Sequence, residues 1–115
     1  MISPSEEWNE VASRKIASSD FLAAMQTYVD MGLRLYVGTD SMLYADHCVY
    51  SCIVAVHAND LNIANYYYQK QKFKGKKYKT LETKILKEVE ISINTADFLK
   101  KKIPEASIEI HVDIG

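Results

Sequence analysis

The chain has 115 residues, 48% of them hydrophobic, and a formal net charge of -1 at pH 7. This length and composition fit one domain with a single core. The balanced charge excludes a protein that binds nucleic acid or anionic membranes by overall positive charge, so any basic surface must be local. The sequence has no run of about 18 apolar residues and does not open like a signal peptide. We therefore expect a cytoplasmic protein without a membrane partner.

The first thirty residues read as helical, with one break. Trp8, Val11 and Ala12 share a helical face, and the segment Ser18-Ser19-Asp20 offers an N-cap for a second helix. Gly32 is placed to end that second helix. The pattern predicts an N-terminal helical extension over residues 1–31, followed by a second region over residues 32–115.

Three strands are predicted next. Residues 33–39 alternate apolar and polar side chains, residues 49–57 form a second apolar run, and residues 63–73 form a third that is rich in tyrosine. Short turns join these runs, and short turns favour antiparallel neighbours. The segment therefore predicts an antiparallel meander.

The spacing of apolar residues then changes. From residue 80 to residue 102 they recur at the i, i+4 spacing of an amphipathic helix, which Pro104 ends. Residues 107–114 return to strict alternation, which indicates a fourth strand. A strand that rejoins the same sheet through a helix makes a right-handed crossover, so the fourth strand should lie parallel to the first, with the helix on one face. The expected fold is thus α/β with a mixed sheet.

Three carboxylates lie where this fold would place them close together. Asp40 ends the first strand and Asp113 ends the fourth, so parallel neighbours would bring both to one sheet edge. Glu88 lies at the border of the apolar stripe of the crossover helix, from which it reaches toward that edge. Glu82 lies in the first helical turn, where a carboxylate is stable anyway, and Glu90 points to solvent.

Carboxylates that lie close together repel one another unless a cation compensates them. Mg²⁺ or Mn²⁺ is the usual compensation, and a divalent ion held by carboxylates and substrate phosphates supports phosphodiester cleavage. We therefore predict that Asp40, Glu88 and Asp113 are metal ligands and catalytic residues of a nuclease. The alternative for Asp40, which Ser41 follows, is an ordinary turn at a strand end.

A local basic segment lies between residues 70 and 79. It contains six lysines and no acidic residue. Lys70, Lys72 and Lys74 alternate, so they should line one face of the third strand, in register with the tyrosines before them. We expect nucleic-acid binding by the lysines at positions 70, 72, 74, 76 and 77. Protection of an edge strand against aggregation explains them equally well.

The histidines and cysteines allow two further readings. His111 alternates onto the face of Asp113, so it is either an auxiliary group near the metal, together with Ser41, or a hydrogen-bonded histidine between sheet and helix. Cys48 and Cys52 should share one face of a strand as reduced, half-buried side chains. A metal site formed with His47 is the alternative, although its spacing fits no standard zinc pattern.

The motifs VGTDS in the first strand, KEVEIS in the crossover helix and IEIHVD in the fourth strand carry a family resemblance. Over residues 20–115 the chain resembles the YkuK-type family, an uncharacterised branch of the ribonuclease H-like superfamily. That resemblance implies a mixed sheet whose first three strands form the meander and whose fourth is parallel to the first. It also implies metal-dependent cleavage of nucleic acid, with the acids carried over to Asp40, Glu88 and Asp113.

The sequence departs from the family pattern at its end. Ribonuclease H-like domains continue past the fourth strand with a helix and a fifth strand, whereas this sequence stops two residues after Asp113. We expect either a fragment whose C-terminal part is missing, or a chain that completes its sheet by self-association or with a partner chain. The alternative function is therefore a module that retains the fold and binds nucleic acid or protein without catalysis.

Overall fold

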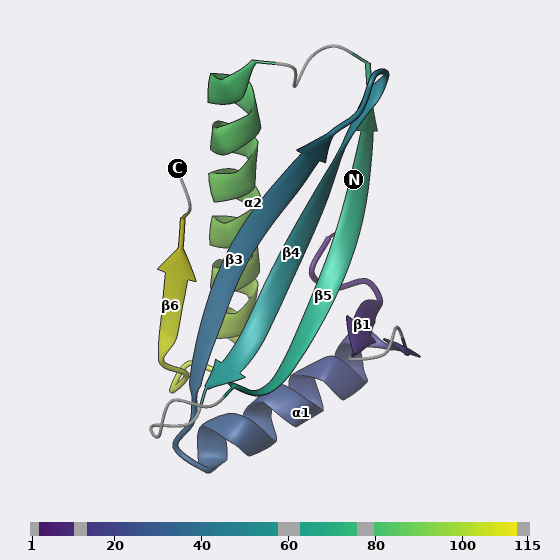
Figure 1. Ribbon diagram of the computed structural model, residues 1–115. Helices are drawn as coiled ribbons and strands as arrows, with labels where there is room; N and C mark the ends of the chain where they lie inside the picture. Colours follow the sequence, from purple (N-terminus) through teal and green to yellow (C-terminus); the bar gives the residue numbers. More distant parts are fainter. Residues whose placement is uncertain (1–2, 11–13, 58–62, 76–79, 113–115) are drawn as a thin grey trace.

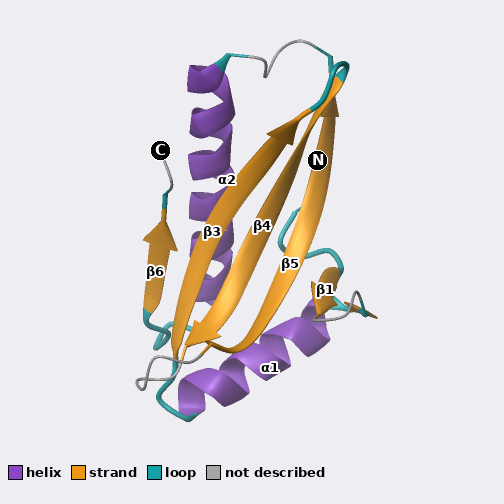
Figure 2. Ribbon diagram, viewed as in Figure 1, coloured by secondary structure: helices purple, strands orange, loops and turns teal. Residues whose placement is uncertain are grey.

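The computed structural model describes residues 3–10, 14–57, 63–75 and 80–112. They form a mixed six-stranded sheet with strand order β2-β1-β5-β4-β3-β6, together with two helices (Figures 1 and 2). In chain order the elements are β1 Trp8–Glu10, β2 Lys15–Ile16, α1 Ser18–Asp30, β3 Arg34–Leu43, β4 His47–His57, β5 Ile63–Lys74, α2 Leu81–Lys102 and β6 Ile108–His111.

The centre of the sheet confirms the expected topology. β3 pairs with β4 and β4 pairs with β5, both antiparallel, so the three strands form a meander. β6 returns after α2 and pairs parallel to β3, with Val37 opposite Ile110 and Gly38 opposite His111. β3 therefore lies between β4 and β6 and has a paired neighbour on each side.

The N-terminal segment is not the predicted first helix. Residues 8–16 contain the strands β1 and β2, which pair antiparallel, and β1 pairs in turn with β5. Trp8 is fully buried, and its ring stacks on that of Phe21 in α1 at 4.1 Å. Helical spacing gave the wrong period here because the pairing with β5, a contact distant in sequence, decides the local conformation. Val11 and Ala12 lie outside the described residues.

The predicted second helix is present as α1, although its N-cap differs. The helix begins at Ser18, the capping residue is Ala17, and no side chain caps it. At the other end Gly32 has a φ of +81°, and its N–H donates to the carbonyl of Val29, while the N–H of Leu33 donates to that of Tyr28. These two bonds form a Schellman motif, so the predicted stop at Gly32 is confirmed.

Both helices pack on one face of the sheet, which we call the helix face. Its strand residues are buried and include Leu35 and Val37 of β3, Val54 of β4 and Tyr67 of β5. No helix among the described residues is long and apolar enough to span a membrane.

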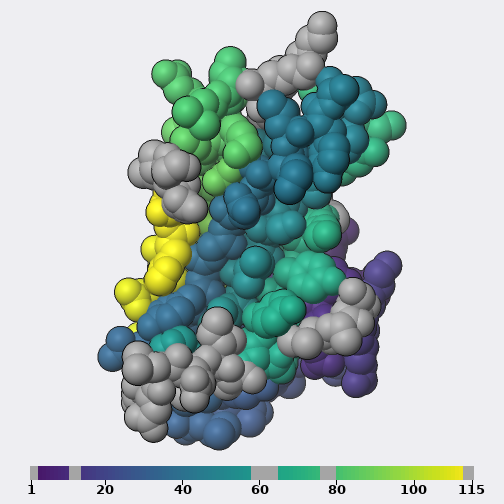
Figure 3. Space-filling view, viewed as in Figure 1, coloured from purple at the N-terminus to yellow at the C-terminus, as the bar shows by residue number. Residues whose placement is uncertain are grey.

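The opposite face carries no helix within the described part of the chain, and we call it the open face. In the space-filling view the strands from β3 (blue) to β5 (teal-green) reach the surface directly, and α2 is visible only beyond the edge of β3 (Figure 3). The strand residues of the open face include Tyr36, Asp40, Ile53 and Lys70. Of these, Asp40, Ile53 and Lys70 are exposed. The sheet thus has one buried and one solvent-facing side, as antiparallel sheets commonly do.

The stack of Trp8 on Phe21 makes a stability prediction. Trp8→Ala should lower the free energy of unfolding by about 3–5 kcal/mol, because it removes a large, fully buried ring and leaves a cavity. Urea unfolding followed by far-UV circular dichroism measures the loss. Leu86→Ala is the control, since Leu86 is 68% exposed in α2 and should change stability by less than about 0.5 kcal/mol. Equal effects of the two substitutions would contradict a core role for β1.

Candidate functional site at the carboxyl end of β3

The carboxyl half of β3 places successive side chains on opposite faces of the sheet. Thr39 and Ser41 point to the helix face, while Asp40 lies between them on the open face and is exposed. The Asp40 carboxylate folds back toward its own strand, where its Oδ1 atom accepts a hydrogen bond from the N–H of Ser41 at 2.9 Å. Asp40 therefore presents a solvent-facing carboxylate held by the backbone of the next residue.

Glu88 approaches the same residue from the other side. It is the one buried Asp or Glu among the described residues, with 5% of its surface exposed, and it accepts a hydrogen bond from the hydroxyl of Ser41. The ammonium group of Lys84, one turn earlier in α2, lies 3.5 Å from the same carboxylate oxygen. A buried carboxylate needs such partners, since its desolvation would otherwise favour protonation.

Ser41 therefore joins two of the three predicted acids. Its N–H contacts Asp40 and its hydroxyl contacts Glu88, so the two carboxylates flank one residue of β3. They do not converge on one face as predicted, because α2 covers the helix face and Asp40 lies on the open face. Asp113 lies outside the described residues. Within those residues there is no group of three or more His, Cys, Asp or Glu side chains that could hold a metal ion.

A line of polar contacts between α2 and the sheet fixes the position of Glu88. Besides the contact of Glu88 with Ser41, the hydroxyls of Ser92 and Thr39 lie 2.7 Å apart, and the Thr95 hydroxyl lies 3.4 Å from the sulfur of Cys52. We call these three contacts the polar seam. Ser92, Thr95 and Cys52 are each 1% exposed, so their hydrogen bonds form away from water.

The polar seam corrects the predicted buried stripe of α2. The i, i+4 spacing of apolar residues predicts that Leu81 lies in the buried stripe and Ile93 beside it, yet these are 68% and 44% exposed. The buried positions are instead Lys87, Glu88, Ile91, Ser92, Thr95, Ala96 and Leu99. The sheet beneath α2 presents hydroxyl and thiol groups, so matching polar side chains are buried in place of apolar ones. Glu82 and Glu90 are exposed, which leaves Glu88 as the acid of α2 nearest the sheet.

The two cysteines lie in the hydrophobic core. Cys48 and Cys52 are free and share the helix face, as expected, but they are fully buried and not half-buried. Burial raises the pKa of the Cys52 thiol. His47 alternates to the other face of β4, where its Nδ1 atom lies 2.6 Å from the carboxylate of Asp46. The alternative metal site of His47 with the two cysteines is therefore not formed.

The described lysines of β5 lie where the alternation placed them. Lys70, Lys72 and Lys74 are exposed on the open face, opposite Ser51, Val49 and His47 of β4. β1 covers the edge of β5 only at Tyr67 and Tyr68, so within the described residues the lysines follow an unpaired stretch of that edge. Both readings of the lysines, phosphate binding and edge protection, are compatible with this position. Lys76 and Lys77 lie outside the described residues.

His111 lies on the open face and not between sheet and helix. Its ring centroid is 4.9 Å from that of Tyr36, and the ring of His57 lies 5.1 Å from Tyr36 on the other side. Tyr36 is thus flanked by two histidines from neighbouring strands. Strand alternation in the sequence places Tyr36 on the same face as Asp40. The cluster with the two histidines can be identified only when the pairing of β3 with both β4 and β6 is known.

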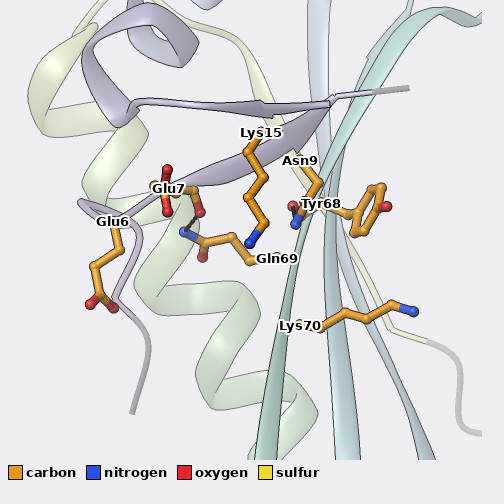
Figure 4. A pocket seen from close by; sticks show the side chains of 7 residues that line it. All are labelled: Glu6, Glu7, Asn9, Lys15, Tyr68, Gln69 and Lys70. Carbon is orange, nitrogen blue, oxygen red and sulfur yellow. Dashed lines mark hydrogen bonds between the residues drawn. The ribbon is translucent and has the colours of Figure 1, made fainter. Parts of the chain in front are cut away.

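One surface hollow lies on the open face, and another lies at the edge of the sheet where β1 joins it. One of about 320 Å³ extends from Asp40 and Ser41 across Ser51 to Lys70, so the acidic end of β3 and the lysine strand border the same depression. The other, of about 460 Å³, lies where β1 and β2 meet β5 and includes Lys15, Asn9 and Tyr68. In Figure 4 Tyr68 and Lys70 point to one side of β5 and Gln69 to the other, as strand alternation requires.

With this geometry in place, the family follows from comparison with known proteins. A family model described as ribonuclease H-like matches residues 17–115, which include α1 and every later element. The chain therefore belongs to the ribonuclease H-like family, as the YkuK-type resemblance indicated, and its sheet is a nuclease-related fold. No curated protein and no solved structure matches the chain.

Ser41 is the residue on which the contact with Glu88 depends. Ser41→Ala should lower the free energy of unfolding by about 1.5–3 kcal/mol, because it removes a hydrogen bond to a buried charge. Urea denaturation at neutral pH measures the change. Ser107→Ala is a matched control at an exposed position and should stay within about 0.5 kcal/mol of wild type. A loss no larger than that of the control would show that Ser41 does not hold Glu88.

Gly38 leaves the middle of the open face without a side chain. A Cβ atom added there would lie 3.5 Å from the carbonyl oxygen of His111, which is ordinary contact, and the φ of Gly38 is not positive. Gly38→Ala should therefore keep stability or raise it by up to about 1 kcal/mol, since it reduces the freedom of the unfolded chain. Thermal melting tests this. A loss of stability above about 1 kcal/mol would mean that the backbone itself requires glycine.

Proposed function

We propose that this chain is a metal-dependent nuclease domain of the ribonuclease H-like type, which hydrolyses phosphodiester bonds of nucleic acid. The observation that carries the proposal is the placement of the Asp40 and Glu88 carboxylates on either side of Ser41, at the carboxyl end of β3. Sites of α/β sheets form at such carboxyl ends. Membership of the ribonuclease H-like family supports the same assignment.

The carboxylates at this end of β3 are the type of donor that a hard divalent cation takes, although Asp40 and Glu88 lie on opposite faces of the sheet. Carboxylate oxygens are the ligands that Mg²⁺ and Mn²⁺ prefer, and such ions are commonly held by one or two carboxylates together with substrate phosphates. Asp40 would hold the ion from the open face, with Asp113 as a further ligand. Glu88 lies on the helix face, so it would become the third ligand only by turning from Ser41 toward the end of β3. When bound, the ion would supply an activated water and stabilise the leaving oxygen.

The protein side chains have separate tasks in this proposal. Asp40 is exposed and meets the substrate phosphate first, whereas the buried Glu88 is positioned by the Ser41 hydroxyl. The lysines at positions 70, 72, 74, 76 and 77 would bind neighbouring phosphates, since each cation that neutralises a phosphate releases a counterion. His111, close to Tyr36, lies on the face that such a substrate would contact.

A non-catalytic nucleic-acid-binding module is the second candidate. One observation favours it, because the Lys84 ammonium already lies 3.5 Å from the Glu88 carboxylate and can neutralise that charge without a metal. In such a module the open face and its lysines bind nucleic acid, while no bond is cleaved. The two candidates differ in their response to divalent ions.

Metal binding is testable without any activity assay. Mg²⁺ or Mn²⁺ at about ten times its dissociation constant should stabilise wild type by about 1.4 kcal/mol, which raises the melting temperature by several degrees. Asp40→Asn should abolish this shift, whereas Asp97→Asn, at an exposed position of α2, should keep it. An equal shift in wild type and Asp40→Asn, or no shift in either, would contradict the metal site.

Cleavage is tested on labelled single-stranded, duplex and hybrid oligonucleotides with Mg²⁺ or Mn²⁺. Wild type should cleave at least one of them, and Asp40→Asn should lose at least about a hundredfold in rate, as expected when a main electrostatic contribution is removed. Lys101→Gln, exposed at the end of α2, is the control and should retain the rate. Nucleic-acid binding without cleavage would favour the second candidate.

A further inference from the structure

We propose that the open face is a binding platform for single-stranded nucleic acid, on which bases stack on tyrosine rings of β5 and β3 while lysines contact the phosphates. This inference names the substrate class of the function proposed above, and it also holds if the chain binds without cleaving. It rests on how the strands align their side chains across the sheet, which is independent of the carboxylates.

The strand registers align one continuous row of side chains across the sheet. Each residue in the row is paired with the next, so all of them lie on the open face. In the order of the strands the row is Lys15, Asn9, Tyr68, Ile53, Gly38 and His111. The row begins with a cation, continues through an aromatic ring and an apolar side chain, and crosses a glycine before it ends at an imidazole.

The neighbouring rows extend this pattern. On one side Tyr66 pairs with Ala55 and Ala55 pairs with Tyr36, so two rings lie on either side of a small residue. Tyr66 and Ile53 are 41% and 39% exposed, so a ligand on the open face can reach both side chains. Flat rings separated by small residues offer shallow surfaces on which planar groups can stack.

The chemistry of these rings favours exposed bases. Stacking of a base on an aromatic side chain is the general mode by which proteins bind single strands without regard to sequence. Duplexes offer their phosphates but hide the faces of their bases in the stack, so the tyrosines of the open face would gain little from them. A sheet face that presents aromatic residues therefore discriminates in favour of single strands.

Charge complementarity supports the same occupant. Lys70, Lys72 and Lys74 follow Tyr68 along the same face of β5, and successive members are about 6.8 Å apart. Lys15 adds a cation in β2, at one end of the row that contains Tyr68. The β5 side of the open face is thus aromatic beside a line of cations, while its acids, Asp40 and Glu109, lie on β3 and β6. The β5 side suits a polyanion with stacked planar groups better than it suits a second copy of a chain whose net charge is near zero.

The platform leads to the carboxylates. Lys70 pairs with Ser51 and Ser51 pairs with Asp40, so two strand spacings, about 10 Å, separate the backbone positions of Lys70 and Asp40. All three residues line the same surface hollow. A strand whose bases stack on Tyr66 and Tyr68 would therefore bring its backbone along Lys70 toward Asp40.

The experiment measures binding with metal removed, so that cleavage plays no part. Fluorescence anisotropy in EDTA uses a labelled oligothymidylate or oligouridylate of about twelve nucleotides, together with a duplex of the same length. Wild type should bind the single strand at least about tenfold more tightly than the duplex. Tyr66→Ala and Tyr68→Ala should each weaken single-strand binding about tenfold, while Tyr66→Phe and Tyr68→Phe should retain it.

The lysines are tested by salt dependence. Binding should weaken as salt rises, and Lys70→Gln with Lys72→Gln should reduce the slope of log K against log salt by about 0.7 for each phosphate that the protein no longer neutralises. Lys101→Gln, exposed at the end of α2 on the helix face, is the matched control and should leave the slope unchanged. Circular dichroism of each variant checks that the sheet is intact.

Four outcomes would overturn the platform: duplex bound as tightly as the single strand, no binding in low salt, binding that survives the alanine variants, or a dimer by light scattering that Tyr66→Ala dissociates. The last would make the open face an interface between copies of the chain. Cleavage without single-strand preference would remove the platform and keep the proposed nuclease. Single-strand binding without a response to metal would keep the platform and remove the proposed nuclease.

Discussion

The packing of α2 on β3 through hydrogen bonds is the constraint on which the rest of the structure depends. An ordinary crossover helix is held by apolar contacts, which tolerate small rotations of the helix. Here the polar seam pairs three buried polar residues of the helix with groups of the sheet: Thr95 with Cys52, Ser92 with Thr39 and Glu88 with Ser41. A buried polar group that loses its partner costs more than a shifted methyl group, so the seam fixes both the rotation and the register of α2.

That constraint has two consequences at the carboxyl end of β3. It keeps the Glu88 carboxyl group inside the protein, where the hydrogen bond from Ser41 and the ammonium group of Lys84 compensate its desolvation. It also keeps the helix face of β3 covered by α2, so that Asp40 lies on the opposite face with the tyrosines and lysines. The two carboxylates are therefore close in space, but one belongs to a packed interior and the other to a surface that can meet a large ligand.

Much of this fold could be predicted from the sequence. Alternation in β3, β4 and β5 and the i, i+4 spacing of α2 predicted the meander and the crossover, because these elements obey the periods of strands and helices. The hairpin of β1 and β2 was missed, since its conformation is decided by pairing with β5 and by the burial of Trp8. The rotation of α2 was also missed, because polar residues such as Ser92 are buried only in the presence of their partners on the sheet.

The sequence predicted which residues form the candidate site, but not how their side chains are arranged. Asp40, Ser41 and Glu88 were identified from strand ends and helix position, and the structure brings them together. Which face each side chain occupies depends on where α2 packs, and the row from Lys15 to His111 depends on five strand pairings that no local pattern encodes. Sequence periodicity predicts which side of its own element a residue occupies, whereas the register between elements decides which residues become neighbours.

The most direct test of this account locates a divalent ion in the protein. Mn²⁺ broadens the NMR signals of nearby nuclei, so a titration of ¹⁵N-labelled wild type with substoichiometric Mn²⁺ maps the site residue by residue. The account predicts that the amide signals of Asp40, Ser41 and Glu88 broaden first, and that Asp40→Asn removes the effect. Broadening centred on other exposed carboxylates, such as Glu6 and Glu7 near β1, with the signals of Ser41 and Glu88 unchanged, would contradict it.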